Sequence, residues 1–224
     1  MSIQSCWPIP VEQRKFPQAS QINPVLAKAF RAVRLALAGS EEATFFASPD
    51  DLLQRIDLPE FRQLIEFIAA SLQETVKQAN AKAWPAGRMA LNLEIMGCWF
   101  QIQNGQAFHD VHTHGNCSWS GIYYIQIDSL EKRATSKMGE LNGVTRFYGP
   151  YTQFLGGAHM DSGNAYLQKN TLDIQPEEGS LILFPAYLPH KAMPYLGDKD
   201  RIILSFNAQI HSNSGGKIYP YSAA

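Results

Sequence analysis

The part of the chain after about Met89 consists of short β-rich runs, and this pattern limits what the chain can fold into. The runs are separated by Gly, Pro, Asn and Asp, with no helical periodicity between them. The expected strands are 90–95, 99–103, 107–113, 120–127, 144–148, 171–175, 180–184 and 201–210. Many short strands in succession predict an all-β sandwich or barrel.

The first part of the chain has helical patterns instead. Apolar residues recur at helical spacing over 24–39, with Pro24 suited to a first turn. A second helix is expected from Asp57, which with Glu60 forms a capping-box pattern, and a short helix is expected after Ser48. The apolar stripe of the second helix indicates a face that packs on a sheet.

A length of 224 residues fits one domain. We expect residues 1–86 to form a helical annex packed on the sheet, 87–212 the β core, and 213–224 a tail. The loop 149–170 is long and rich in Gly, Tyr, Asn and Ser, which is typical of a functional loop such as a lid.

Composition excludes several classes of function. A formal net charge of −1 gives no basic footprint for nucleic acid or an anionic membrane. No apolar run approaches the roughly 18 residues of a membrane helix, and the start lacks a signal-peptide pattern. The three cysteines have no paired spacing and indicate free thiols, so we expect a cytoplasmic protein.

A pair of histidines is the main chemical signal. His112 and His114 stand at i and i+2, so on a strand both imidazoles point to one face. Asp110 shares that face by parity, which makes Asp110 and His112 a rival pair. Alone, such a pair is a weak signal of metal binding.

The C-terminal part adds a third histidine and an arginine. A buried strand, 180–184, leads through a proline-bounded turn to His190, and the chain re-enters at Arg201. A guanidinium on an apolar strand needs an anionic partner, because an unpaired buried charge is costly. A ligand carboxylate meets that need with bidentate geometry, and an edge salt bridge with Asp198 or Asp200 is the alternative.

Several blocks of this sequence together resemble a known family. In chain order they are Trp99-Phe100, His112-x-His114, Trp119-Ser-Gly-Ile-Tyr-Tyr124, Gly179-Ser-Leu-Ile-Leu-Phe-Pro185, His190 and Arg201-Ile-Ile-Leu-Ser-Phe-Asn207. Their order and spacing are similar to those of the 2-oxoglutarate–Fe(II) oxygenases, over about residues 95 to 210.

The resemblance implies a double-stranded β-helix (a cupin-like jelly roll), an Fe(II) centre and 2-oxoglutarate as co-substrate. His112 corresponds to the first metal ligand and His190 to the distal histidine. Arg201 corresponds to the basic residue that pairs with the distal carboxylate of 2-oxoglutarate. Ser205 shares the strand face of Arg201, and Tyr124, in preference to Tyr123, is expected to offer a hydroxyl to the co-substrate.

His114 departs from the family pattern, because the second ligand is usually a carboxylate. Three histidines also suit zinc, with water in the fourth position. The expected metal ligands are therefore His112, His114 and His190, with the identity of the metal left open.

The resemblance implies an enzyme that hydroxylates a small-molecule or peptide substrate. One alternative is a three-histidine cupin-type enzyme without 2-oxoglutarate, which would not need Arg201 in its pocket. Another is a non-enzymatic metal-binding jelly-roll module, which a fourth protein ligand such as Asp110 or His109 would favour. Neither nucleic acid nor membrane is an expected partner, and a homodimer is left open.

Overall fold

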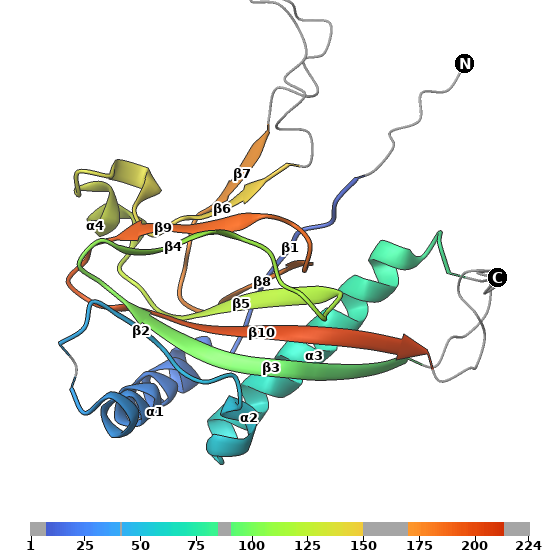
Figure 1. Ribbon diagram of the computed structural model, residues 1–224, viewed down its shortest axis with the longest axis horizontal. Coiled ribbons are helices and arrows are strands. Elements are labelled where there is room, and N and C mark those ends of the chain that lie inside the picture. The colour runs from blue at the N-terminus through green and yellow to red at the C-terminus, as the bar shows by residue number, and fades with distance from the viewer. Residues whose placement is uncertain (1–7, 41, 85–90, 150–169, 213–224) are drawn as a thin grey trace, which may run out of the picture.

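The computed structural model describes residues 8–40, 42–84, 91–149 and 170–212 (Figure 1). The tail expected from residue 213 lies outside these ranges, as does nearly all of the expected lid loop. The described residues form two antiparallel sheets and a set of helices.

The two sheets face each other as a jelly roll. The larger has the strand order β1-β8-β5-β10-β3-β2 and the smaller β4-β9-β6-β7. The strands are β1 Glu12–Lys15, β2 Phe45–Ala47, β3 Leu91–Gln103, β4 Ala107–His112, β5 Trp119–Gln126, β6 Thr145–Tyr148, β7 Thr171–Ile174, β8 Ser180–Pro185, β9 His190–Tyr195 and β10 Arg201–Ser212. From β3 to β10 the chain passes back and forth between the sheets, which is the winding of a double-stranded β-helix. The predicted fold class is confirmed.

Helices cover the outer face of the larger sheet (Figure 1). They are α1 Ala19–Ala38, α2 Leu52–Arg55 and α3 Pro59–Asn80, while α4 Leu130–Ala134 and the 3₁₀ turn η1 Gly139–Leu141 follow β5. Phe30 of α1 stacks on Phe100 of β3, with ring centroids 4.6 Å apart. This contact belongs to a hydrophobic core shared by helices and sheet.

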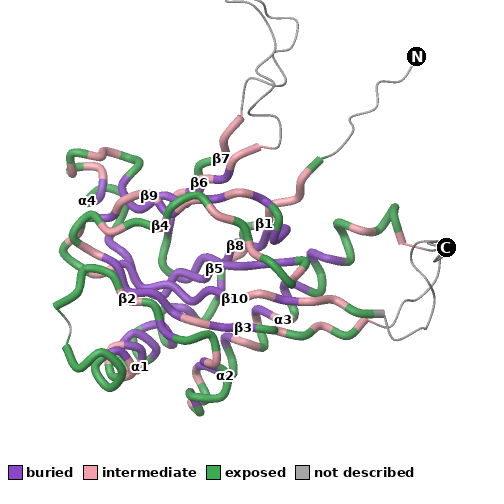
Figure 2. Tube along the Cα trace, viewed as in Figure 1, coloured by how far each residue is buried: buried purple, intermediate pink, exposed green. Residues whose placement is uncertain are grey.

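Burial follows the central strands (Figure 2). Every residue of β8 is buried, as are all but the last of β5. Strands buried on both faces lose the alternating pattern of a half-exposed strand. Here the inner face lies toward the smaller sheet and the outer face toward the helices.

Several element boundaries differ from the sequence prediction. The expected strands 90–95 and 99–103 are one strand, β3, because β10 pairs along its whole length with a bulge at Asn207 and Ala208. The sequence does not predict the strand β9, because Pro194 and the nearby Gly197 indicate a turn. Pro194 lies inside β9 although proline has no N–H to donate to a neighbouring strand.

The helix starts were also misplaced. α1 begins at Ala19, five residues before Pro24. Ala19 and Ile22 are buried in the core, and this burial stabilises an extra helical turn before Pro24. α3 begins at Pro59 without a side-chain cap, so the capping-box prediction at Asp57 was wrong. Asp57 forms an ion pair with Arg62 instead.

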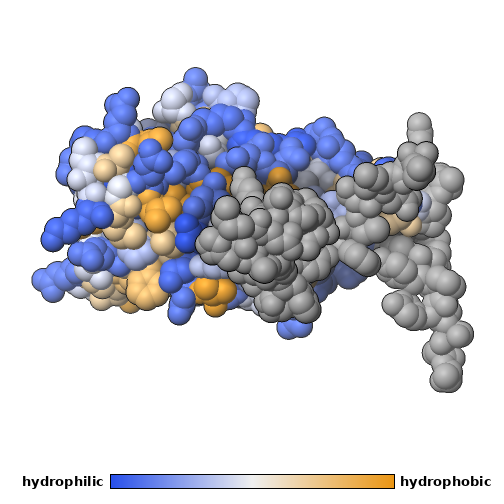
Figure 3. Space-filling model, turned by 90° about the horizontal axis from the view of Figure 1, so that it is seen from above, coloured by the Kyte–Doolittle hydropathy of each residue, from blue (hydrophilic) through white to orange (hydrophobic). Residues whose placement is uncertain are grey.

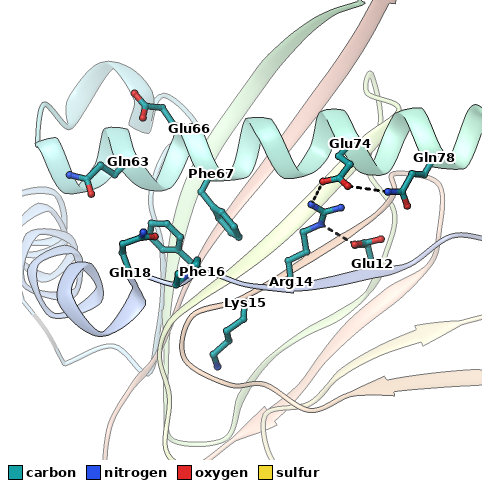
Figure 4. A pocket seen from close by; sticks show the side chains of 11 residues that line it. Glu12, Arg14, Lys15, Phe16, Gln18, Gln63, Glu66, Phe67, Glu74 and Gln78 are labelled. Atoms are coloured by element: carbon teal, nitrogen blue, oxygen red, sulfur yellow. Dashed lines mark hydrogen bonds and ion pairs between the residues drawn. The ribbon is translucent and has the colours of Figure 1, made fainter.

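The N-terminal segment also contributes strands to the larger sheet. β1 pairs with β8 and β2 pairs with β3. A surface groove lies between β1 and α3 (Figure 4), where Arg14 of β1 contacts both Glu12 and Glu74, the latter on α3. This ion-pair network ties the helix to the sheet edge.

The surface seen from above is mainly hydrophilic, with apolar areas between polar side chains (Figure 3). Among the described residues, no helix is both long and apolar enough to cross a membrane.

Candidate metal centre

Three histidines converge where β4 ends and β9 begins. His112 ends β4, His114 follows two residues later, and His190 opens β9 directly opposite His112. One ligand nitrogen from each lies within 4.8 Å of the others, and the Nε2 atoms of His114 and His190 are 3.3 Å apart. Such a cluster has the donor type and spacing for a single transition-metal ion.

Backbone carbonyls orient two of these rings. His190 Nδ1 lies 3.0 Å from the carbonyl oxygen of Leu188, and His112 Nδ1 lies 2.7 Å from that of Asp110. A carbonyl only accepts, so each Nδ1 carries the proton and donates it. Nε2 of both rings is therefore left with a lone pair for a metal.

Burial keeps His114 and His190 neutral. Desolvation lowers the pKa of His190 to about 3 and the pKa of His114 to about 4, with nearby histidines adding to both shifts. Metal binding requires the neutral imidazole. At neutral pH, His114 and His190 therefore do not have to lose a proton before they bind a metal ion.

Asp110 does not join the cluster. Its side chain is exposed, and Oδ1 accepts a hydrogen bond from Val111 N and lies 3.4 Å from Lys191 Nζ. The pairing of β4 with β9 shifts register on both sides of His109, so strict alternation fails there. The bulge explains why the parity argument, which made Asp110 a rival partner for His112, does not hold in the folded chain.

The same bulge brings in His109, which the sequence analysis named only as a possible fourth ligand of a non-enzymatic metal-binding module. Its ring centroid lies 4.0 Å from that of His112, and the half-buried ring lines the same internal cavity. It is not part of the three-residue ligand group. Sequence parity gives no signal for a bulge, so this placement could not be read from spacing.

Arg201 lines the same cavity and is completely buried. Its Nη1 donates to Gln103 Oε1 at 2.6 Å, while Nε and Nη2 have no partner among the described residues. The alternative salt bridges do not form: Asp198 pairs with Lys132 and Asp200 with Arg31. The guanidinium charge is therefore available to a ligand.

The other predicted co-substrate residues come from β5 and β10 of the larger sheet. Ser205, on β10 with Arg201, lines the cavity. Tyr124 is fully buried with its ring centroid 5.2 Å from Arg201 Cζ, and its hydroxyl hydrogen-bonds Thr145 Oγ1 at 2.6 Å. Tyr123 points to the other side of the strand, where its hydroxyl donates a hydrogen bond to Oδ1 of Asn23.

The chain matches a family model described as "Putative 2OG-Fe(II) oxygenase", where 2OG is 2-oxoglutarate. The match covers residues 97–207, about half of the chain, and includes the three histidines and Arg201. The chain belongs to the 2OG-Fe(II) oxygenase family. The oxygenase has no match among curated proteins compared by sequence.

Solved structures share the fold of this oxygenase. A prolyl-4-hydroxylase from Pseudomonas putida is 16% identical with a TM-score of 0.53, covering 90% of this chain and 93% of that one. HygX from Streptomyces hygroscopicus, solved with nickel and 2-oxoglutarate, is 12% identical with a TM-score of 0.56, covering 90% and 82%. The epimerase SnoN from nogalamycin biosynthesis is 12% identical with a TM-score of 0.52, covering 96% and 88%.

Proposed function

We propose that this oxygenase is an Fe(II)- and 2-oxoglutarate-dependent dioxygenase that hydroxylates a small-molecule or peptide substrate. We propose His112, His114 and His190 as the iron ligands, and Arg201, Ser205 and Tyr124 as the residues that bind 2-oxoglutarate. When bound, the iron and 2-oxoglutarate together supply the activation of dioxygen for oxidation of a C–H bond. The chain supplies binding, orientation and a buried cavity.

The donor set fits a ferrous ion. Neutral imidazoles suit iron as well as zinc, and the three ligand nitrogens lie within 4.8 Å of one another. The ligand set carries no negative charge of its own, unlike a site with two histidines and a carboxylate. A bound 2-oxo acid would offset that difference, because its carboxylate can also ligate the metal.

The single observation that carries the proposal is the state of Arg201. A buried guanidinium with two free donors needs an anion, and the anion must reach it through a cavity that also contains the three histidines. 2-Oxoglutarate has a chelating end and a distal carboxylate. Thr145, whose hydroxyl is bonded to that of Tyr124, lines the same cavity, and Ser205 lines it four residues further along β10.

The domain arrangement is part of this proposal. We propose one domain over residues 1–224, with residues 1–86 packed on the sheet of a core over 87–212 and a tail from 213. The shared hydrophobic core and the pairing of β1 and β2 with core strands support it.

The test is an anaerobic titration of Fe(II)-loaded protein with 2-oxoglutarate, followed by the weak visible charge-transfer band of the chelate. The wild type is expected to develop the band, and Arg201→Ala to need about 100-fold more 2-oxoglutarate while keeping its metal. Absence of the band from iron-loaded wild type would contradict the proposal. That result would favour the three-histidine cupin-type enzyme or the metal-binding module, and metal analysis for zinc would be the next measurement.

A further inference from the structure

Gln103 is the direct partner of Arg201. It ends β3, and its Cα lies opposite that of Arg201 in the antiparallel pair of β3 with β10. Both side chains are completely buried. Because a guanidinium only donates hydrogen bonds, Gln103 must present Oε1 to Arg201 Nη1. The orientation of the amide is thereby fixed, and its Nε2 faces away from Nη1.

The pair leaves three buried donors without an acceptor. They are Arg201 Nε, Arg201 Nη2 and Gln103 Nε2, none of which has a partner among the described residues. A buried donor without an acceptor has lost its hydrogen bonds to water with nothing in return, and this is most costly for a charged group. A carboxylate offers two oxygens with about four lone-pair sites, which is enough for all three donors.

Burial alone does not leave an arginine unpaired in this protein. Arg133 is 1% exposed, and each of its nitrogens has an acceptor: the carbonyl oxygens of Asp128, Asn142 and Pro176 and the side chain of Gln175. Arg133 is thus satisfied within the fold. Gln103 and Arg201 are as deeply buried as Arg133, but three of their donor nitrogens lack an acceptor among the described residues.

We propose that Gln103 is a binding and positioning residue for the distal carboxylate of the co-substrate. Its Oε1 holds Arg201 in place, and its Nε2–H donates to the carboxylate. Because the amide is neutral, the subsite keeps the full positive charge of Arg201 and selects 2-oxo acids with a charged distal group. This inference rests on the proposed function and adds a residue to it.

The experiment compares two substitutions at Gln103 with a matched one beside the satisfied arginine. Gln103→Glu puts a carboxylate against Arg201, and Gln103→Met removes both the oxygen and the NH2 of the amide. Gln175→Glu is the control, because it puts a carboxylate against Arg133. Calorimetric titration of the anaerobic Fe(II) proteins measures the Kd of 2-oxoglutarate and of 2-oxoglutaramate, whose distal group is a neutral amide. Metal content and thermal unfolding show whether each variant is folded and loaded.

The expected result is a change in both affinity and selectivity. Gln103→Glu is expected to weaken 2-oxoglutarate binding about 100-fold, because the new carboxylate neutralises Arg201 and repels the ligand. Binding of 2-oxoglutaramate is expected to change far less, so the preference for the charged ligand collapses. Gln103→Met is expected to weaken 2-oxoglutarate about 10-fold, and Gln175→Glu to leave both constants unchanged.

The outcomes separate this inference from the proposed function. If wild type binds 2-oxoglutarate and Arg201→Ala does not, but both Gln103 variants bind like wild type, the inference is wrong and the function stands. If wild type itself takes no 2-oxoglutarate, both are wrong. If every variant, including Gln175→Glu, lost affinity equally for 2-oxoglutarate and 2-oxoglutaramate, the effect would be a general structural one and the inference would be overturned.

Discussion

The Nε2 atoms of His114 and His190 lie 3.3 Å apart, although 76 residues separate them in the chain. His190 carries its proton on Nδ1, where it donates to Leu188, so its Nε2 presents a lone pair. Two imidazole lone pairs at this distance repel each other unless a proton or a cation lies between them. A metal ion bound by both nitrogens satisfies them together with His112.

Replacing His190 by alanine is expected to abolish metal binding, because the two remaining ligands no longer enclose the ion. The control is His211→Ala, which removes an exposed histidine that hydrogen-bonds only Gln209 in the described residues. Metal content after anaerobic loading and desalting is the measurement. Stoichiometric iron in His190→Ala would count against this ligand set.

Substituting His114 by aspartate restores the carboxylate usual for the family. The variant is expected to keep one metal per chain and to favour iron over zinc more than wild type does, because carboxylate lowers the charge of the site. Asp110→Asn is the matched change at the exposed rival position and is expected to alter nothing. Competitive loading with Fe(II) and Zn(II) checks both, and identical behaviour of His114→Asp and wild type would mean that His114 is not a ligand.

Arg133 and Arg201 are expected to respond oppositely to substitution by methionine. Arg133→Met leaves four acceptors without a donor and is expected to cost about 3 kcal/mol of the free energy of unfolding. Arg201→Met removes an uncompensated buried charge and is expected to leave stability equal or higher. Urea unfolding of ligand-free protein measures both, and a large loss in Arg201→Met would show that Arg201 is structural.

Metal-free protein is expected to lose stability as the pH falls below about 6.5. In the unfolded chain His114 and His190 take protons at their ordinary pKa, whereas burial lowers the folded pKa values to about 4 and about 3. The unfolded state therefore binds more protons in this window, and the free energy of unfolding decreases with falling pH. Above the window their contribution is constant.

Urea unfolding in the presence of a chelator at pH 7.5, 6 and 5 measures this dependence. His190→Gln is expected to flatten it, because one depressed pKa is removed, and His211→Ala to keep the slope of wild type. Equal slopes for wild type and His190→Gln would contradict the assignment.

Much of the core could be predicted from sequence because its signals are local. Alternating β-rich runs placed most of the β-helix strands, and the spacing of His112 and His114 predicted that both rings lie on one face. Pro194 made β9 unrecognisable as a strand, because proline is rare inside strands. The long β3 was read as two, because its continuous pairing with β10 depends on residues about 110 positions away.

The rest of the site depends on contacts that no local pattern records. The bulge in β4 arises from register with β9, and it decides that His109 faces the cavity while Asp110 faces Lys191. Gln103 is one of several glutamines in the sequence. Only its position opposite Arg201 distinguishes it.

Arg201 is held on two sides before any ligand arrives. Gln103 bonds Nη1, and the guanidinium lies against the ring of Tyr124, whose hydroxyl is tied across the barrel to Thr145 on the other sheet. An anchor fixed in this way loses little side-chain entropy when it captures an anion. We therefore expect co-substrate capture to be a single fast step, with the lifetime of the complex rather than its rate of formation responding to substitutions around the anchor.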